Sequence, residues 1–168
     1  MSVGAAVNLE HALKVSDRNS GHTVQGHVDG VGRIESIAPE GASLRIVIST
    51  NSMSDDSTVR RYYNSLIVPK GFIAVDGASL TVCKVDQTLG TFTLMLIPHT
   101  QEVLKKWKVG DFVNIELDCL AKLISSSLDS FVDPLVASLK SRALRAELLS
   151  LVALAACAAT VGWVIRKA

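Results

Sequence analysis

The sequence predicts an all-β fold, a six-stranded antiparallel Greek-key barrel followed by a C-terminal α-helix. Two observations lead to this prediction. Up to Ser125, short segments alternate apolar and polar residues and are separated by Gly, Asp and Pro, which is typical of an antiparallel barrel or sandwich. After Ser125 the chain becomes rich in Ala and Leu, and residues 135–168 have the composition of a helix.

The expected strands follow one another at short intervals. Residues 43–49 alternate, with Leu44, Ile46 and Ile48 on one face, and an Asp-Gly turn signal at residues 76–77 separates two further apolar runs. The other strands are expected at 23–37, bent at Gly30 and Gly32, and at 71–75, 79–85, 91–98 and 112–117.

Composition excludes several classes of protein. The 168 residues carry a net charge of +1, which argues against a nucleic-acid binder that relies on phosphate contacts. The cysteines, Cys83, Cys119 and Cys157, form no C-x-x-C pair, so we expect neither a disulfide scaffold nor a metal site. Residues 1–13 lack a secretory signal, and reduced thiols predict an intracellular, cytoplasmic protein.

A short internal repeat divides the chain. Residues 4–10 and 110–116 share Gly, Val, Asn and Glu in the same register, which is either chance or the trace of a tandem duplication. If it is a duplication, residues 1–16 are the closing strand of an earlier barrel with a linker. Residues 17–124 are then one complete barrel, and residues 125–168 are a linker with Ser and Asp-Pro signals followed by the apolar helix.

The most distinctive motif is Gly21-His22-Thr23-Val24-Gln25-Gly26-His27-Val28-Asp29-Gly30-Val31-Gly32. No Gly-Lys-Ser/Thr follows, so it is not a phosphate-binding loop. On a strand, His22 and His27 would point to opposite faces and could not easily bind one metal. One surface and one core histidine is the alternative to a functional pair.

A second motif runs from Lys70 to Val82. Ser79 and Thr81 alternate with Leu80 and Val82, so both hydroxyls are expected on one side of a strand, near Lys70. They could hydrogen-bond a polar ligand ring, or they could be the solvent face of an amphipathic strand. No Gly-x-Ser-x-Gly elbow marks a hydrolase nucleophile.

Two further motifs, Leu96-Ile97-Pro98-His99-Thr100 and Lys108-Val109-Gly110-Asp111-Phe112-Val113-Asn114-Ile115-Glu116, complete a set of four. In this order and spacing, residues 7–122 closely resemble the C-terminal, lumazine-binding barrel of riboflavin synthase. Members of that family carry two such barrels in tandem, which would explain the repeated Val-Asn-x-Glu.

The resemblance implies dismutation of two 6,7-dimethyl-8-ribityllumazine molecules to riboflavin and 5-amino-6-ribitylaminouracil, with no metal or other cofactor. It implies Ser79 and His22 as the residues for proton transfer or for orienting the nucleophile. It also implies a homo-oligomer, a trimer in the family, with active sites between an N-barrel and a C-barrel. The lumazine-contacting residues that it implies are Gly26, His27, Val28, Lys70, Ser79, Leu80, Thr81, Leu96, Ile97 and Thr100.

Two departures from the family matter; the first leaves the function open, and the second is expected to alter only a loop. The Met-Phe-Thr-Gly-Ile-Val start and the Gly-Cys-Cys-Leu-Thr-Val strand of the N-barrel are not found, and residues 101–106 replace a Thr-rich turn. A synthase, a lumazine- or flavin-binding barrel without turnover, and a membrane-tethered structural protein are therefore alternatives. The intact polar set of Lys70, Ser79, Thr81 and Thr100 argues against the third.

The C-terminal segment 148–165 contains no charged residue and is long enough to span a bilayer as a helix. A membrane tail anchor is one interpretation, and a trimerising helix, as in the family, is another. An error in the gene sequence at this end is the third.

Overall fold

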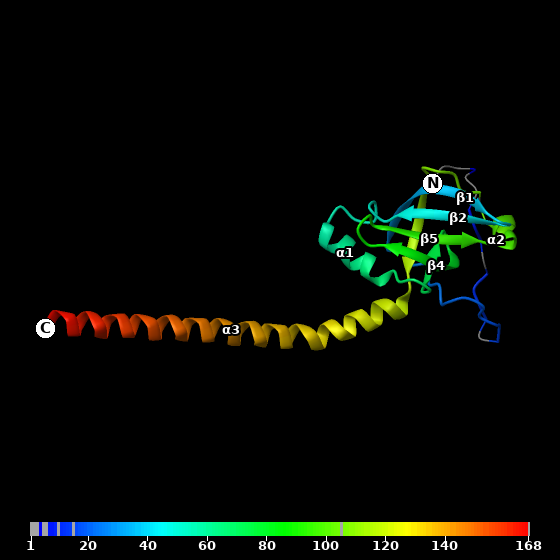
Figure 1. Ribbon diagram of the computed structural model, residues 1–168. Helices are drawn as coiled ribbons and strands as arrows, with labels where there is room; N and C mark the ends of the chain where they lie inside the picture. The colour runs from blue at the N-terminus through cyan, green and yellow to red at the C-terminus, as the bar shows by residue number, and fades with distance from the viewer. Residues whose placement is uncertain (1–3, 5–6, 10, 15, 105, 168) are drawn as a thin grey trace. The chain divides into compact units, whose positions relative to one another are not determined.

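The computed structural model describes residues 4, 7–9, 11–14, 16–104 and 106–167; for residues 146 and 152–167 it describes the backbone only. The chain divides into two compact units, Met1–Leu123 and Ile124–Ala168. The first unit contains every strand of the described chain, and the second consists of most of the C-terminal helix (Figure 1).

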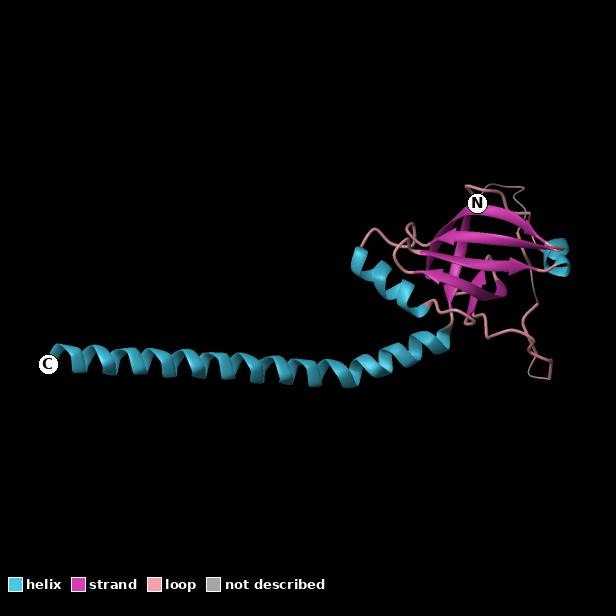
Figure 2. Cartoon of the chain, in the orientation of Figure 1, coloured by secondary structure: helices cyan, strands magenta, loops and turns pink. Residues whose placement is uncertain are grey.

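The six strands form one closed antiparallel barrel with the neighbour order β1-β2-β5-β4-β3-β6 (Figure 2). Because β3, β4 and β5 are consecutive hairpins and β6 returns beside β3, the connection is a Greek key. The predicted fold is confirmed. The elements are β1 (Gly30–Glu40), β2 (Ser43–Ser49), α1 (Ser57–Leu66), β3 (Phe72–Val75), β4 (Ala78–Asp86), β5 (Thr91–Leu96), α2 (Pro98–Val103), β6 (Phe112–Leu117) and α3 (Cys119–Lys167).

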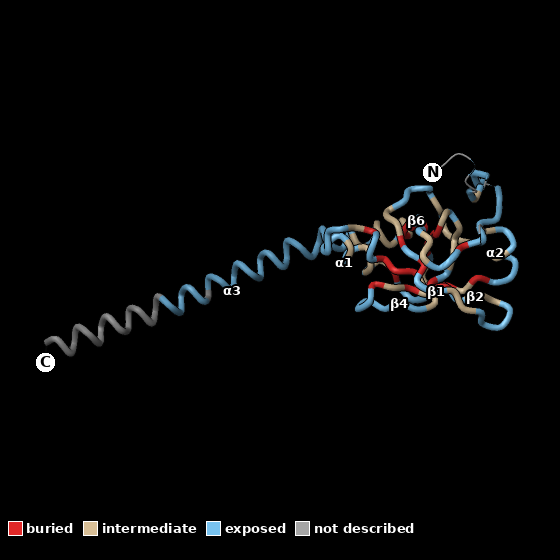
Figure 3. Tube along the Cα trace, turned by 90° about the horizontal axis from the view of Figure 1, so that it is seen from above, coloured by how far each residue is buried: buried red, intermediate tan, exposed pale blue. Residues whose placement is uncertain are grey.

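Alternation along the strands builds the barrel core. Buried and half-buried residues alternate along the whole of β5, so that Phe92, Leu94 and Leu96 point inward. Gly32 of β1 leaves space for the core, because a Cβ there would lie 2.5 Å from Cδ1 of Ile115 and 2.8 Å from Cγ2 of Ile48. In Figure 3 the buried residues gather in the barrel, and residues 126–145 and 147–151 of α3 are exposed.

The first predicted strand, 23–37, is partly wrong. β1 begins only at Gly30 and pairs there with Ile115 of β6. Residues 21–29 form no strand, since Gly26 has a positive φ of 77° and the segment is held by side chains instead of by a ladder. Strand β5 ends at Leu96, because Pro98 opens α2 and restricts the residue before it.

The linker predicted to begin at Ser125 is also wrong, because helix α3 runs through it from Cys119 to Lys167 with Pro134 inside. The serines fit a helix by donating to the carbonyl three residues earlier, as the Ser130 hydroxyl does to Ser127 at 2.6 Å.

At the N-terminal end, residues 7–9 and 11–14 form no strand, contrary to the remnant strand predicted for residues 1–16. The barrel is closed by the pairing of β1 with β6, and so leaves no sheet edge for another strand. Instead, the Asn8 side-chain amide donates to the carbonyl of Asp76 at 3.0 Å.

In the part of the chain that the structure describes, no helix is both long enough and apolar enough to cross a membrane. The segment 148–165, for which a membrane anchor was one interpretation, lies mostly among residues whose side chains are outside the description.

Candidate functional site

The glycine- and histidine-rich motif lies across the outer face of three neighbouring strands; residues 21–29 are called the motif segment below. In the ladder, Ala74 of β3 is paired with Ser79 of β4 and with Glu116 of β6, so these three residues point to the same side. That side faces away from the core, yet Ala74 is 1% exposed and Glu116 is 5% exposed. The motif segment bonds to both neighbours of Ala74, and so covers this face.

His22 is held on Ser79 by two contacts. Its backbone N–H donates to Ser79 Oγ at 3.2 Å, and its Nδ1 lies 2.7 Å from the same oxygen. The imidazole also stacks on the ring of Phe72, with centroids 5.3 Å apart. Gly21 makes this approach possible, because a Cβ there would lie 2.5 Å from Ser79 Oγ.

The distances within the His22–Ser79 pair are compatible with two tautomers of the imidazole, and the hydrogen bonds favour one of them. If the Ser79 hydroxyl donates to Nδ1, its hydrogen and Nδ1 are both satisfied, and the neutral imidazole carries its proton on Nε2. The reverse assignment leaves the hydroxyl hydrogen without an acceptor among the described contacts. His22 Nε2 is buried and has no partner in the described chain. With that tautomer, the pair presents one unsatisfied N–H donor.

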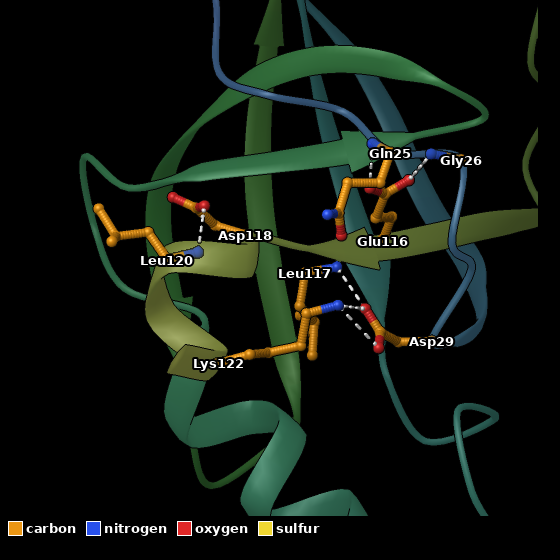
Figure 4. Close-up of polar contacts among 8 residues, drawn as sticks. All are labelled: Gln25, Gly26, Asp29, Glu116, Leu117, Asp118, Leu120 and Lys122. Atoms are coloured by element: carbon orange, nitrogen blue, oxygen red, sulfur yellow. Dashed lines mark hydrogen bonds and ion pairs between the residues drawn. The ribbon is translucent and has the colours of Figure 1, made fainter. Parts of the chain in front are cut away.

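Carboxylates fasten the motif segment to β6 at two points (Figure 4). Glu116 accepts from the backbone N–H groups of Gln25 at 2.7 Å and Gly26 at 2.9 Å. In return, Asp29 of the segment accepts from the N–H of Leu117 at 2.7 Å and pairs with Lys122 Nζ at 2.9 Å. Glu116 and Asp29 were not among the predicted site residues, although the repeated Val-Asn-x-Glu contains the first of them.

A third carboxylate fixes the β3–β4 turn that precedes Ser79. Asp76 has a positive φ of 48° and accepts from the backbone N–H of Asn114 at 2.8 Å. Its other oxygen accepts from the indole Nε1–H of Trp107 at 2.9 Å. The predicted Asp-Gly turn is confirmed. Its aspartate also links Asn114 of β6 to Trp107, which precedes that strand in the chain.

The remaining predicted residues divide into two groups. Thr81 is on the same face of β4 as Ser79, two positions further along. Lys70 is bonded to the strand beyond it, because its N–H donates to the Val82 carbonyl at 2.7 Å. His27 and Val28 follow the Glu116 anchor and are exposed.

The other group lies elsewhere. Leu80 and Leu96 pack into the barrel core, so their side chains face away from Ser79 and Thr81. Leu96 also lines a cleft of about 220 Å³ with Leu104 and Trp107. Ile97 precedes α2 and Thr100 lies in it, and no described hydrogen bond links either one to the His22–Ser79 pair. Among the described residues, no three His, Cys, Asp or Glu side chains gather as metal ligands.

The fold places the chain among the small closed β-barrel domains. The chain belongs to the lumazine-binding domain family, whose description is "Lumazine binding domain" and whose model matches residues 25–118. The resemblance inferred from the four sequence motifs is thereby confirmed.

Curated relatives agree with this assignment. The chain is 43% identical over 129 residues to a riboflavin synthase of Saccharomyces cerevisiae, covering 74% of this chain and 51% of that protein. It is 39% identical over 128 residues to the riboflavin synthase of Photobacterium phosphoreum, covering 75% of this chain and 54% of that protein. The chain thus spans about half the length of the curated relatives it matches.

Among solved structures, LumP complexed with 6,7-dimethyl-8-(1'-D-ribityl) lumazine matches with a TM-score of 0.42 and 20% identity. That match covers 58% of this chain and 49% of LumP.

Proposed function

We propose that this chain acts in a riboflavin synthase, where it binds 6,7-dimethyl-8-ribityllumazine against the motif segment and the outer face of β4. The observation that carries the proposal is His22 Nε2, a buried ring nitrogen with no partner in the described chain. A buried, unsatisfied N–H is costly, and an acceptor atom of a bound ring would satisfy it.

The surroundings of that donor suit a flat ring with polar edges. The Phe72 side chain is 43% exposed and offers an aromatic surface beside His22. The Thr81 hydroxyl follows on the same face of β4, and the backbone of Lys70 is bonded to the next residue of that strand, Val82. Both side chains have donors for ring carbonyls or for the ribityl chain.

In the proposed reaction, one lumazine loses a proton from its acidic methyl group and a four-carbon unit passes to the second molecule. Riboflavin and 5-amino-6-ribitylaminouracil are the two products. We assign the Ser79–His22 pair to proton transfer or to orienting the nucleophile, since the pair has a hydroxyl and an imidazole in direct contact. Holding two rings in register would supply much of the rate.

The reaction needs two lumazine molecules, whereas the described residues offer one His–Ser pair on one barrel face. Turnover therefore requires a second face, from another copy or another barrel. Lumazine or flavin binding without turnover is the second candidate function, and this observation favours it.

We also propose a homo-oligomer, a trimer as in the family, assembled through α3. Apolar residues recur along this helix every three or four positions, and each is more than half exposed. They are Leu120, Ile124, Leu128, Phe131, Leu135 and Leu139. The cytoplasmic location expected from the sequence stays a prediction.

The test is to titrate the purified chain with 6,7-dimethyl-8-ribityllumazine and follow ligand fluorescence and flavin formation. Binding with flavin formation supports the synthase, and binding without it leaves only the second candidate. If the chain does not bind lumazine, both candidates are wrong. Sedimentation of the wild type and of Phe131→Asp, which places a charge on the apolar face of α3, tests the oligomer.

A further inference from the structure

We propose that Glu116 is a positioning residue, which fixes His27 and Val28 in a ligand-ready conformation before any ligand binds. The inference rests on the proposed function, because it takes these two residues as lumazine contacts. Glu116 itself touches only the backbone of the motif segment.

The two exposed residues lie between anchors to consecutive positions of β6. Before them, the Gly26 N–H donates to Glu116 at 2.9 Å. After them, the Asp29 N–H donates to the Ile115 carbonyl at 2.9 Å, and the Asp29 carboxylate accepts from the Leu117 N–H at 2.7 Å. Both ends of this two-residue stretch are thus fixed to one strand (Figure 4), while His27 and Val28 themselves are exposed.

The burial of Glu116 shows why a carboxylate is needed there. The residue is 5% exposed, and none of the described ion pairs involves it. Its charge is instead balanced by the two backbone N–H dipoles of Gln25 and Gly26, which point at separate oxygens. An isosteric amide offers one acceptor and turns an NH₂ group toward the second N–H.

The experiment compares Glu116→Gln with Glu35→Gln, the same change at an exposed position of β1. Without ligand, we measure hydrogen exchange at the Gln25 and Gly26 amides and at core amides such as Ile115. With 6,7-dimethyl-8-ribityllumazine, we measure Kd by fluorescence. For Glu116→Gln we expect faster exchange at Gln25 and Gly26, protection retained at the core amides, a lower Tm because one buried hydrogen bond is lost, and a Kd raised by about 10-fold. For Glu35→Gln we expect no change in any of these.

Glu116→Asp keeps the charge but shortens the reach to the two amides, so we expect an intermediate Kd. If Glu116→Gln does not fold, the same exchange and Kd measurements are made on Glu116→Asp. Slow exchange at Gln25 and Gly26 in the variants, or fast exchange with a Kd within about twofold of the wild type, would overturn the proposal. Failure of the wild type to bind lumazine contradicts the proposed function instead, and the ligand-free exchange data still report whether Glu116 holds the segment.

Discussion

Ser79 Oγ lies 2.7 Å from Nδ1 of His22, although the two residues are 57 positions apart in the chain. The same hydroxyl accepts the His22 backbone N–H, so one serine fixes both the ring and the backbone of the motif segment.

Replacing Ser79 by alanine removes both contacts and releases the imidazole. We expect about a 10-fold loss of lumazine affinity, or roughly 1.4 kcal/mol, because the released imidazole no longer holds Nε2 in place for its hydrogen bond to the ligand. Fluorescence titration measures this loss. Ser36→Ala, which changes an exposed serine of β1, is the matched control. Equal affinities of the two variants would contradict the role of Ser79.

Gly21→Ala tests the same contact from the other side. The new Cβ would lie 2.5 Å from Ser79 Oγ and 2.9 Å from Ser79 Cβ, so the motif segment must move away from β4. We expect weaker lumazine binding, measured by the same titration. Gly41→Ala, at φ +60° in the β1–β2 turn with open space around it, should lower stability by about 1 kcal/mol and leave affinity unchanged. If Gly21→Ala bound lumazine as tightly as the wild type, the close approach of Gly21 to Ser79 would not matter for binding.

Thr50→Val tests the attachment of α1 to the barrel. The Thr50 hydroxyl, on a residue only 1% exposed, lies 2.6 Å from Asn64 Oδ1 of α1 and 2.9 Å from the Gly90 carbonyl oxygen. Valine keeps the shape and leaves these acceptors with one bond fewer, so we expect a loss of about 2 kcal/mol in the free energy of unfolding. Urea denaturation measures it, and Thr50→Ser, which keeps the hydroxyl, should lose less. If Thr50→Val left the free energy of unfolding unchanged, the Thr50 hydroxyl would not be what holds α1 to the barrel.

The N-cap of α1 predicts a pH dependence. Hydrogen bonds from the backbone N–H groups of Thr58 and Val59 hold the pKa of Asp56 below its ordinary value. A lowered pKa means that the carboxylate stabilises the helix above pH about 4, and that this contribution is lost as the pH falls through the folded-state pKa. We therefore expect the Tm difference between wild type and Asp56→Ala to shrink on acidification. Asp55→Asn, at the neighbouring position outside the cap, should follow the wild type at every pH.

The sequence predicted the barrel strands well because each strand has one buried face. In β5 the alternation of Phe92, Leu94 and Leu96 is visible without any knowledge of the partner strands. Helix α1 was missed, although its sequence carries a signal. Val59, Tyr62 and Leu66 recur at helical spacing after the N-cap at Asp56, but none of the residues of this helix is fully buried. The linker prediction after Ser125 relied on Ser and Pro as breakers, and these residues were overridden by the surrounding helix formers.

Only part of the candidate site could be predicted from the sequence. Ser79 and Thr81 could be placed on one face by their spacing, and the family resemblance added His22. The anchors at Glu116 and Asp29 could not be found, because each joins residues about ninety positions apart whose proximity depends on barrel closure. The same closure places Leu80 and Leu96 inside the barrel, where their side chains cannot share a surface with Ser79.

Barrel closure also sets the order in which the chain can fold. Strand β1 pairs with its neighbour β2 and with the last strand, β6, and the second pairing closes a loop that contains nearly the whole domain. Hairpins such as β3–β4 can form locally and early, whereas Glu116 and Leu117 reach the motif segment only once β6 has docked. The proposed ligand surface should therefore be completed in the last step of folding. A lumazine-like ligand would then bind only to fully folded barrels. By mass action it would raise the free energy of unfolding of the barrel.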